Sequence, residues 1–175
     1  FSHGYSVFKS LVVMKELYRF DTVMEMLDPI KGGYRCVFYD AKVVDRFPKG
    51  RKTRVILRID DVLELQCGLQ SNGDGRYFSM IGRGRLEGHT YELGQPISVV
   101  VYEDPNQLGV ELPEVLVELI AQDEIIERVW NKLSDGRKRT LCHTLHRIKD
   151  VDKQVRKAMD FLELEREKLA DKGKW

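Results

Sequence analysis

The chain changes its hydrophobic repeat near residue 111, and this change predicts two parts of different structure. Before residue 111, short segments alternate apolar and polar residues, which is the repeat of a strand with one buried face. After it, apolar residues recur every three or four positions, which is the repeat of an amphipathic helix, and glycines become rare. The pattern therefore predicts an α+β protein with its boundary between Glu111 and Leu112.

The first part predicts seven or so short strands separated by turn residues. The clearest segments are 16–25, 34–39, 53–59, 62–70, 76–81 and 97–102. Asp60-Asp61 supplies a hairpin turn between the third and the fourth of these segments. Residues 40–48 have helical spacing up to Pro48 and predict one or two helical turns. Many short strands with tight turns between them favour a small β-barrel, closed or nearly closed.

The second part predicts a bundle of about four short helices. Pro113 suits the first turn of the first helix, and Asp123 and Ser134 suit the N-caps of the second and third. The fourth helix carries Val151, Val155, Ala158, Met159 and Leu162 on one face, and its charged end after Glu163 is expected to fray into solvent. Each helix carries apolar residues on one face, and we expect these faces to form the core of the bundle.

Regular patterning begins near Lys15, so the residues before it stand apart. We expect residues 1–14 to be a disordered extension or a segment added by cloning, with Met14 as a candidate native start. Residues 15–111 then form the barrel domain and residues 112–175 the helical domain. The apolar stretch from residue 7 to residue 14 is interrupted by Lys9 and Ser10, so it predicts neither a transmembrane span nor a signal peptide.

Composition and charge place the chain among ordinary globular proteins. Of its 175 residues, 42% are hydrophobic and 33% are charged, with 29 Lys and Arg against 28 Asp and Glu. Both predicted parts are close to neutral, so overall charge gives no reason to expect nucleic acid or an anionic membrane as the partner. Cys36, Cys67 and Cys142 are odd in number and widely spaced, which fits buried thiols in a reducing compartment, so we expect a cytoplasmic location.

Several motifs follow one another in an order known from other proteins. In the first part they are Met80-Ile81-Gly82-Arg83-Gly84-Arg85-Leu86 and the segment 93–101. In the second part they are the segment 112–116, Asp123, Leu133, Arg137-Lys138-Arg139, Cys142-His143 and Ile148-Lys149. Together they resemble a barrel domain of unknown function followed by the bacteriocin-protection domain called YdeI or OmpD-associated. Gln95 stands where that family usually has Asp, and Gln154-Val155 interrupts its usual arginine-rich stretch.

The resemblance covers nearly the whole chain after Leu17 and carries expectations of its own. It implies a split barrel of the kind used by small transition-state regulators and antitoxins. It also implies a helical module that is linked to tolerance of antimicrobial peptides. It implies no established chemistry, so function has to be argued from the residues themselves.

The sequence predicts no catalytic, metal or cofactor site. Residues 82–88 are rich in glycine, but their spacing is not that of a phosphate-binding loop and a strand follows them, so we interpret the glycines as a tight turn. Cys142 and His146 have the spacing of two zinc ligands on one helix, but no third or fourth ligand accompanies them. We interpret them as a buried thiol and a partly exposed histidine. With no motif for nucleophilic or acid–base catalysis, we expect a protein that is not an enzyme.

The strongest local bias is the basic run from Lys42 to Arg58, in which Asp45 is the only acid. The turn after the strand at 76–81 and the start of the third helix are basic as well. The candidate binding residues are Lys49, Arg51, Lys52, Arg54, Arg58, Arg83, Arg85, Arg137, Lys138 and Arg139. A surface of this kind would meet phosphates or another anionic partner. The alternative interpretation is a solvated barrel rim whose charge is balanced by acids elsewhere.

Three functions stay open from the sequence. The leading hypothesis is a non-enzymatic stress-tolerance or interaction protein that binds an anionic ligand or a protein partner through the basic rim. The second is a nucleic-acid-binding regulator, which the split-barrel resemblance and the basic run favour and which strictly monomeric behaviour would oppose. The third is a small-molecule binder that uses the barrel interior, which requires an apolar cavity with a few polar groups.

Overall fold

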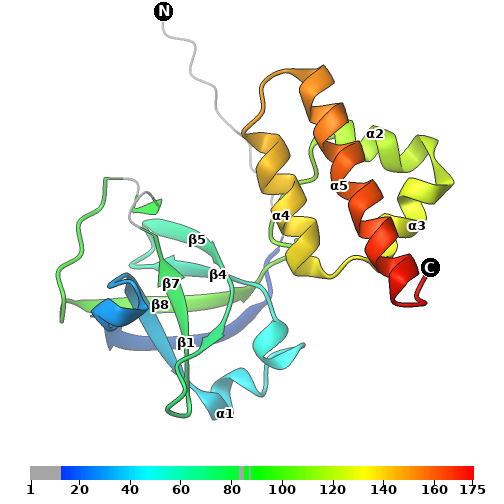
Figure 1. The fold of residues 1–175 in the computed structure, drawn as a ribbon. Helices are drawn as coiled ribbons and strands as arrows, with labels where there is room; N and C mark the ends of the chain where they lie inside the picture. Colours follow the sequence, from blue (N-terminus) through cyan, green and yellow to red (C-terminus); the bar gives the residue numbers. More distant parts are fainter. Residues whose placement is uncertain (1–12, 83–84, 87) are drawn as a thin grey trace, which may run out of the picture. The chain divides into compact units, whose positions relative to one another are not determined.

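The structure is a computed structural model that describes residues 13–82, 85–86 and 88–175 (Figure 1). The chain divides into two compact units, of which the first ends at Gln107 and the second is Leu108–Trp175. The first is called the β unit and the second the helical unit below. Strands and helices are segregated between the two units, so the protein is of the α+β class. Most of the segment expected to be an extension, residues 1–12, lies outside the described residues.

The β unit contains eight described strands and three short helical turns. The strands are β1 (Glu16–Val23), β2 (Glu25–Met26), β3 (Arg35–Asp40), β4 (Val55–Ile59), β5 (Leu63–Cys67), β6 (Gln70–Ser71), β7 (Arg76–Ile81) and β8 (Pro96–Glu103). The turns are η1 (Pro29–Lys31), α1 (Ala41–Val44) and η2 (Gly50–Lys52). The helical turn expected before Pro48 is therefore confirmed as α1. The segment expected as one strand from Val62 to Gln70 is divided between β5 and β6.

The eight strands form two antiparallel sheets of four strands each. Sheet A has the order β1-β8-β4-β5, and sheet B has the order β2-β3-β7-β6. The chain passes between the sheets four times, through the β3–β4 and β7–β8 connections and at two short corners, which lie at Met24 between β1 and β2 and at Gly68-Leu69 between β5 and β6. At the first corner Met24 stays bonded to the residues before β8, because its N–H donates to the Gln95 carbonyl and its carbonyl accepts from the Gly94 N–H. Of the expected barrel, closed or nearly closed, the closed form is wrong, because the described strands pair as two separate sheets, and the split barrel stays a prediction.

Both sheets pack against one core. Sheet B contributes Val37 and Ile81, and sheet A contributes Leu57, Leu65 and Val99, all of them buried. These positions follow the alternation that predicted the strands, so burial of one face fixes the strand register. The β4–β5 hairpin turns at Asp60-Asp61, where both residues have positive φ, 50° and 58°, and the Val62 N–H donates to the Ile59 carbonyl across this type I′ turn. The predicted hairpin is confirmed.

The helical unit contains α2 (Glu114–Gln122), α3 (Glu124–Lys132), α4 (Asp135–His146) and α5 (Val151–Asp171). The carboxylate of Asp123 accepts from the N–H groups of Ile125 and Ile126, and the Ser134 hydroxyl accepts from the Arg137 N–H, so both predicted N-caps are confirmed. Pro113 lies at the N-cap of α2 rather than in its first turn.

Helix α5 packs against the other three helices of this unit (Figure 1). Its buried Ala158 and Leu162 join Leu116, Val129 and Leu141 in the core of the helical unit. The helix also continues beyond Glu163 to Asp171, so the expectation that it frays there is wrong. The reason lies at Glu165, which is buried beneath two cations of the same unit and ties the last turns of the helix down. Among the described residues, none of the helices combines the length and the apolar character that crossing a membrane requires.

Candidate anion-binding surfaces

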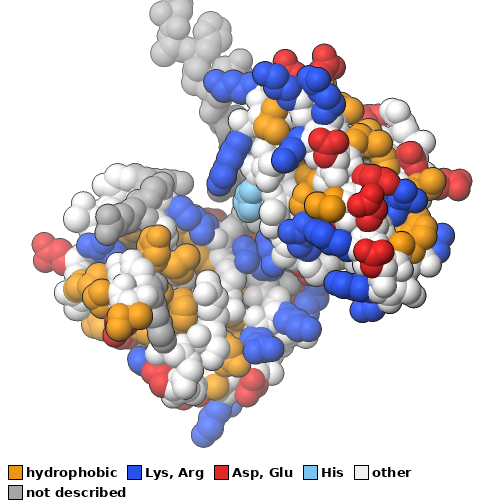
Figure 2. All heavy atoms as spheres, in the orientation of Figure 1, with side chains coloured by type: hydrophobic (Ala, Val, Ile, Leu, Met, Phe, Trp, Pro, Cys, Tyr) orange, Lys and Arg blue, Asp and Glu red, His pale blue; other side chains and the backbone are white. Residues whose placement is uncertain are grey.

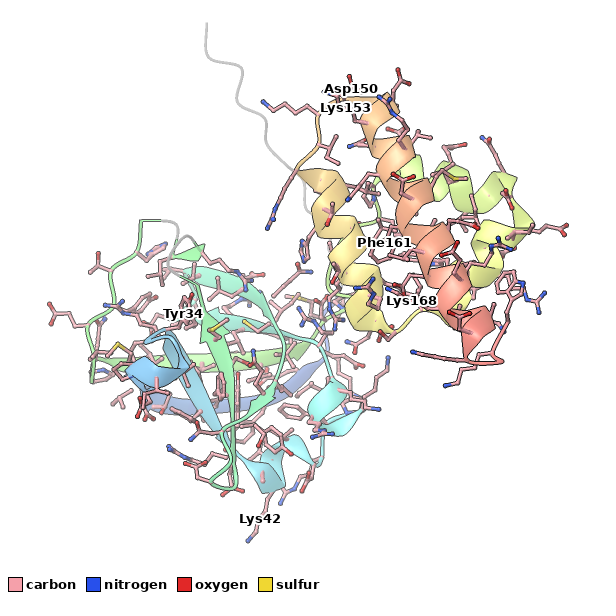
Figure 3. All side chains as sticks on the ribbon, viewed as in Figure 1. Tyr34, Lys42, Asp150, Lys153, Phe161 and Lys168 are labelled. Atoms are coloured by element: carbon pink, nitrogen blue, oxygen red, sulfur yellow. The ribbon has the colours of Figure 1, made fainter. Side chains whose placement is uncertain are left out.

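Five exposed cations lie on the segment that connects β3 to β4 in the β unit. They are Lys42, Arg46, Lys49, Arg51 and Lys52, and we call them the α1–η2 ridge. Figure 2 shows Lys and Arg side chains over this segment, and Figure 3 shows Lys42 pointing away from the body of the unit. The two outermost of these residues in the sequence, Lys42 and Lys52, belong to α1 and η2, so the ridge follows the whole connection.

Local interactions hold this segment in place and turn its polar residues outward. The carboxylate of Asp40 caps α1 by accepting from the Lys42 N–H at 2.8 Å. Val44 and Phe47 are buried in the core of the β unit and anchor the segment from below. The buried Thr53 accepts the Lys49 N–H at its hydroxyl oxygen, at 2.9 Å. Because the apolar positions are fixed inward, the cations between them project into solvent.

The cations of the ridge are not neutralised by neighbouring acids. In the part of the chain that the structure describes, no carboxylate oxygen lies within 4.0 Å of a side-chain nitrogen of these five residues. Asp45 is the only acid between Lys42 and Lys52. Exposed cations without a carboxylate partner among the described residues are available to attract an incoming anion.

Arg58, Arg54 and Arg85 were expected to belong to the same surface, but each makes contacts inside the β unit. The Arg58 guanidinium donates to Glu64 at 3.0 Å and to the Tyr102 hydroxyl at 3.1 Å, and it lies 4.9 Å from the centre of the Tyr102 ring. The hydrogen bond to Glu64 raises the pKa of the Arg58 guanidinium above its usual value. Arg58 therefore serves the outer face of sheet A rather than a ligand.

Arg54 and Arg85 both approach the end of β5. A Cβ atom on Gly68 would lie 2.7 Å from an Nη atom of Arg54, so the half-buried guanidinium occupies space that this glycine leaves open. Arg85 donates to the Gln66 carbonyl. Both side chains are therefore committed to the strand that they cover. Arg83 and Gly84 lie outside the described residues, so the basic turn is only partly described.

The predicted basic run of the helical unit, Arg137-Lys138-Arg139, is also used internally. Arg137 donates to Glu165 at 2.5 Å and lies 4.6 Å from the centre of the Phe161 ring. Lys138 lies over the ring of Trp130, 5.3 Å from its centre, and Arg139 donates to the Leu108 carbonyl at 3.2 Å. Each of these cations joins two segments of the unit, so the run stabilises the helices.

A second unneutralised cluster, which the sequence reasoning missed, lies where α4 leads into α5. Its members are Arg147, Lys149, Lys153, Arg156 and Lys157, and we call them the α4–α5 cluster. All five side chains are exposed, and within the described residues none of them lies in an ion pair. A count of charges over residues 147–157 finds five basic residues against two acids, Asp150 and Asp152, and would have revealed the cluster.

The three thiols are placed where they are least reactive. Cys36, Cys67 and Cys142 are buried and free. Burial raises the pKa of Cys36 to about 11, and it also raises the pKa values of Cys67 and Cys142. A thiol protonated at neutral pH is a poor nucleophile and a poor metal ligand.

Cys142 and His146 are divided between the core and the surface. Cys142 packs in the core of the helical unit, whereas the exposed His146 places its Nε2 2.8 Å from the Glu111 carbonyl oxygen. The described residues contain no group of three or more His, Cys, Asp or Glu side chains placed to hold a metal ion. The interior between the sheets is filled by buried side chains, and a surface hollow of about 240 Å³ lies between residues 13–15 and 103–107.

In comparisons with known proteins, no family model, no curated protein and no solved structure matches this chain. The resemblance of its motifs to the YdeI or OmpD-associated family therefore stays a prediction.

Proposed function

We propose that this protein acts by binding a polyanionic partner through the α1–η2 ridge of its β unit. The observation that carries the proposal is the unpaired state of the ridge cations. Of the ten candidate residues predicted from the sequence, only Lys49, Arg51 and Lys52 belong to the ridge, and the other described candidates make internal contacts. Five cations gathered in this way repel one another, and a bound anion relieves that repulsion.

A binding function fits the described side chains better than a catalytic one does. Catalysis by a thiol needs a lowered pKa, and the pKa values of all three thiols are raised by burial. The interior of the β unit is occupied by its own core, which argues against a small molecule held between the sheets. An exposed, charged segment is instead suited to a large partner that presents its charge on the outside.

The ridge bears on the peptide tolerance that the family resemblance implies. Antimicrobial peptides that act on membranes are basic amphipathic chains. The ridge would repel such a peptide, so tolerance mediated by this surface would arise through an anionic partner rather than by capture of the peptide.

Heparin-affinity chromatography with a salt gradient tests the proposal. The test variant is Lys49→Glu, Arg51→Glu, Lys52→Glu, which reverses three ridge charges at exposed positions. The control is Lys15→Glu, Lys172→Glu, Lys174→Glu, which makes the same change in net charge at exposed positions outside both clusters. We expect the wild-type protein and the control to stay on the column up to about 150 mM salt, and the ridge variant to elute at clearly lower salt.

The control separates a local surface from overall charge. Equal elution of the two variants would mean that only net charge matters, and it would remove the ridge from the proposal. Passage of the wild-type protein through the column even at low salt would reject anion binding altogether. Thermal unfolding of all three proteins, with equal midpoints, establishes that the ridge variant is folded.

A further inference from the structure

The helical unit separates its charges along the chain. Residues 111–127, which include α2 and the first turn of α3, contain six acids and no Lys or Arg. Residues 128–157 contain ten Lys and Arg against three acids. A nearly neutral unit therefore presents strongly acidic and strongly basic regions. Figure 2 shows the Lys and Arg side chains gathered at the end of the unit where α4 joins α5.

The basic region itself divides into cations that are used and cations that are not. Arg137, Lys138 and Arg139 are held by Glu165, Trp130 and the Leu108 carbonyl. Arg128 and Lys132 lie beside the ring of Trp175, 4.7 and 5.9 Å from its centre. The five cations of the α4–α5 cluster have no such role, since their side chains are exposed and unpaired within the described part of the chain.

Backbone interactions fix the segment that carries the α4–α5 cluster. The carboxylate of Asp150 accepts from the Lys153 N–H at 2.8 Å and caps α5 (Figure 3). The Gln154 amide donates to the carbonyl oxygens of Leu145 and Ile148, at 3.1 and 2.8 Å, and so ties the start of α5 to the end of α4. The cluster is therefore presented on a defined turn rather than on a loose loop.

The chemistry of both clusters favours phosphate groups over the surface of another protein. Six of their ten members are Lys, a residue that is depleted in protein–protein interfaces, which usually have an apolar or aromatic centre. Between the cations of the α1–η2 ridge, the apolar residues Val44 and Phe47 point inward. Between the cations of the α4–α5 cluster, only Val151 is a largely exposed apolar residue. Contacts to a phosphate backbone need little besides positive charge.

The same composition separates a duplex from a single strand. Proteins that bind single strands stack bases on exposed aromatic side chains. Among the described residues, Tyr34 is the only exposed Phe, Tyr or Trp, and it belongs to neither cluster. A duplex offers its phosphates without requiring stacking.

We infer that the polyanion bound by this protein is a nucleic-acid duplex, and that the α4–α5 cluster is a second phosphate-binding surface for a ligand of this class. The inference rests on the proposed function of the ridge and adds to it a second site and a ligand class. Two linked sites raise the affinity for a polyanion that is long enough to reach both of them. A single small anion would use only one of them.

Fluorescence anisotropy with a labelled 36-base-pair DNA duplex tests this inference, in a salt series from about 50 to 200 mM. The cluster variant is Lys149→Glu, Lys153→Glu, Lys157→Glu, and a milder form carries Gln at the same positions. We expect the Glu variant to weaken duplex binding at least tenfold at low salt and the Gln variant to weaken it less. The slope of log K against log salt should become less steep by about 3 when the three contacts are lost. The charge control defined above should bind like the wild-type protein.

The Glu variant is compatible with the fold, because acids are favourable in the first turn of a helix, where Lys153 lies. Should it nevertheless melt at lower temperature, the Gln variant, which adds no repulsion, decides the test. Wild-type affinity and slope in the Gln variant would then overturn the second surface.

Competition with single-stranded DNA of the same sequence and with poly-glutamate decides the ligand class. We expect both to compete more weakly than the unlabelled duplex at equal charge concentration. Stronger competition by poly-glutamate would overturn the duplex in favour of an acidic protein segment, and stronger competition by the single strand would overturn it in favour of unpaired nucleic acid. In either case retention on heparin through the ridge would still stand. If the wild-type protein does not bind heparin at all, the proposed function fails first and the inference fails with it.

Discussion

Two basic runs that look alike in the sequence have opposite roles in the structure. Lys49 to Lys52 and Arg137 to Arg139 are both short runs rich in Lys and Arg. In the helical unit the side chains turn back onto Glu165, Trp130 and a backbone carbonyl, whereas in the β unit they extend into solvent without a carboxylate partner among the described residues. Cations that already have partners contribute to stability, and those without partners remain able to bind a ligand. The count of basic residues is therefore a poor guide unless the partners are known.

The largest effect on stability should follow from reversing Arg137. The change Arg137→Glu would place a second carboxylate beside Glu165, whose side chain is only 11% exposed, and would remove the cation over Phe161. We expect a loss of about 2 kcal/mol in the free energy of unfolding. Urea unfolding followed by tryptophan fluorescence measures it. A change below about 0.5 kcal/mol would mean that the contacts of this run contribute no more to stability than the exposed cations of the ridge do.

A smaller effect should appear on acidification. Burial tends to raise the pKa of Glu165, but the hydrogen bonds from Lys168 and Arg137 outweigh it and hold this pKa below the usual 4.5. Because the pKa is lower in the folded state, the contribution of Glu165 to stability is present above pH 4.5 and is lost as the pH falls through the folded value. Unfolding curves at pH 7 and below pH 4 should show this loss. In Glu165→Gln the decline should be shallower, and an unchanged decline would assign it to other carboxylates.

Arg58 tests the same contrast within the β unit at a smaller scale. The change Arg58→Lys keeps the charge but loses the planar group that reaches both Glu64 and Tyr102. We expect a loss of about 0.5 kcal/mol in the free energy of unfolding, because the pair is partly exposed. Retention on heparin should stay at the wild-type level. Earlier elution of this variant would return Arg58 to the binding surface.

The smallest effect on stability is expected on the ridge itself. Lys49→Glu alters an exposed side chain and leaves the hydrogen bond from the Lys49 backbone N–H to the Thr53 hydroxyl in place. The free energy of unfolding should change by less than about 0.5 kcal/mol, or rise slightly as repulsion within the ridge falls. Differential scanning calorimetry of this variant and of Arg137→Glu compares the two losses of stability directly. A marked loss of stability would show that the ridge, too, has a structural role.

Local patterns predicted most of the secondary structure, because each depends on residues near in sequence. The Asp60-Asp61 hairpin and the caps at Asp123 and Ser134 are of this kind. The errors concern contacts between distant residues. The end of α5 does not fray because Glu165 meets Arg137, which is 28 positions away. The described strands form no closed barrel because strands of sheet A do not pair with strands of sheet B.

The candidate site shows the same difference between local patterns and contacts of distant residues. The sequence by itself determined that basic residues concentrate between Lys42 and Arg58 and between Arg137 and Arg139, and that the periodicity of their apolar neighbours makes strands in one part and helices in the other. Only the tertiary structure decided which of these cations meet a carboxylate, an aromatic ring or a carbonyl and which stay open. Long side chains reach partners that the fold brings close from far along the chain, and spacing within the sequence carries no record of those partners.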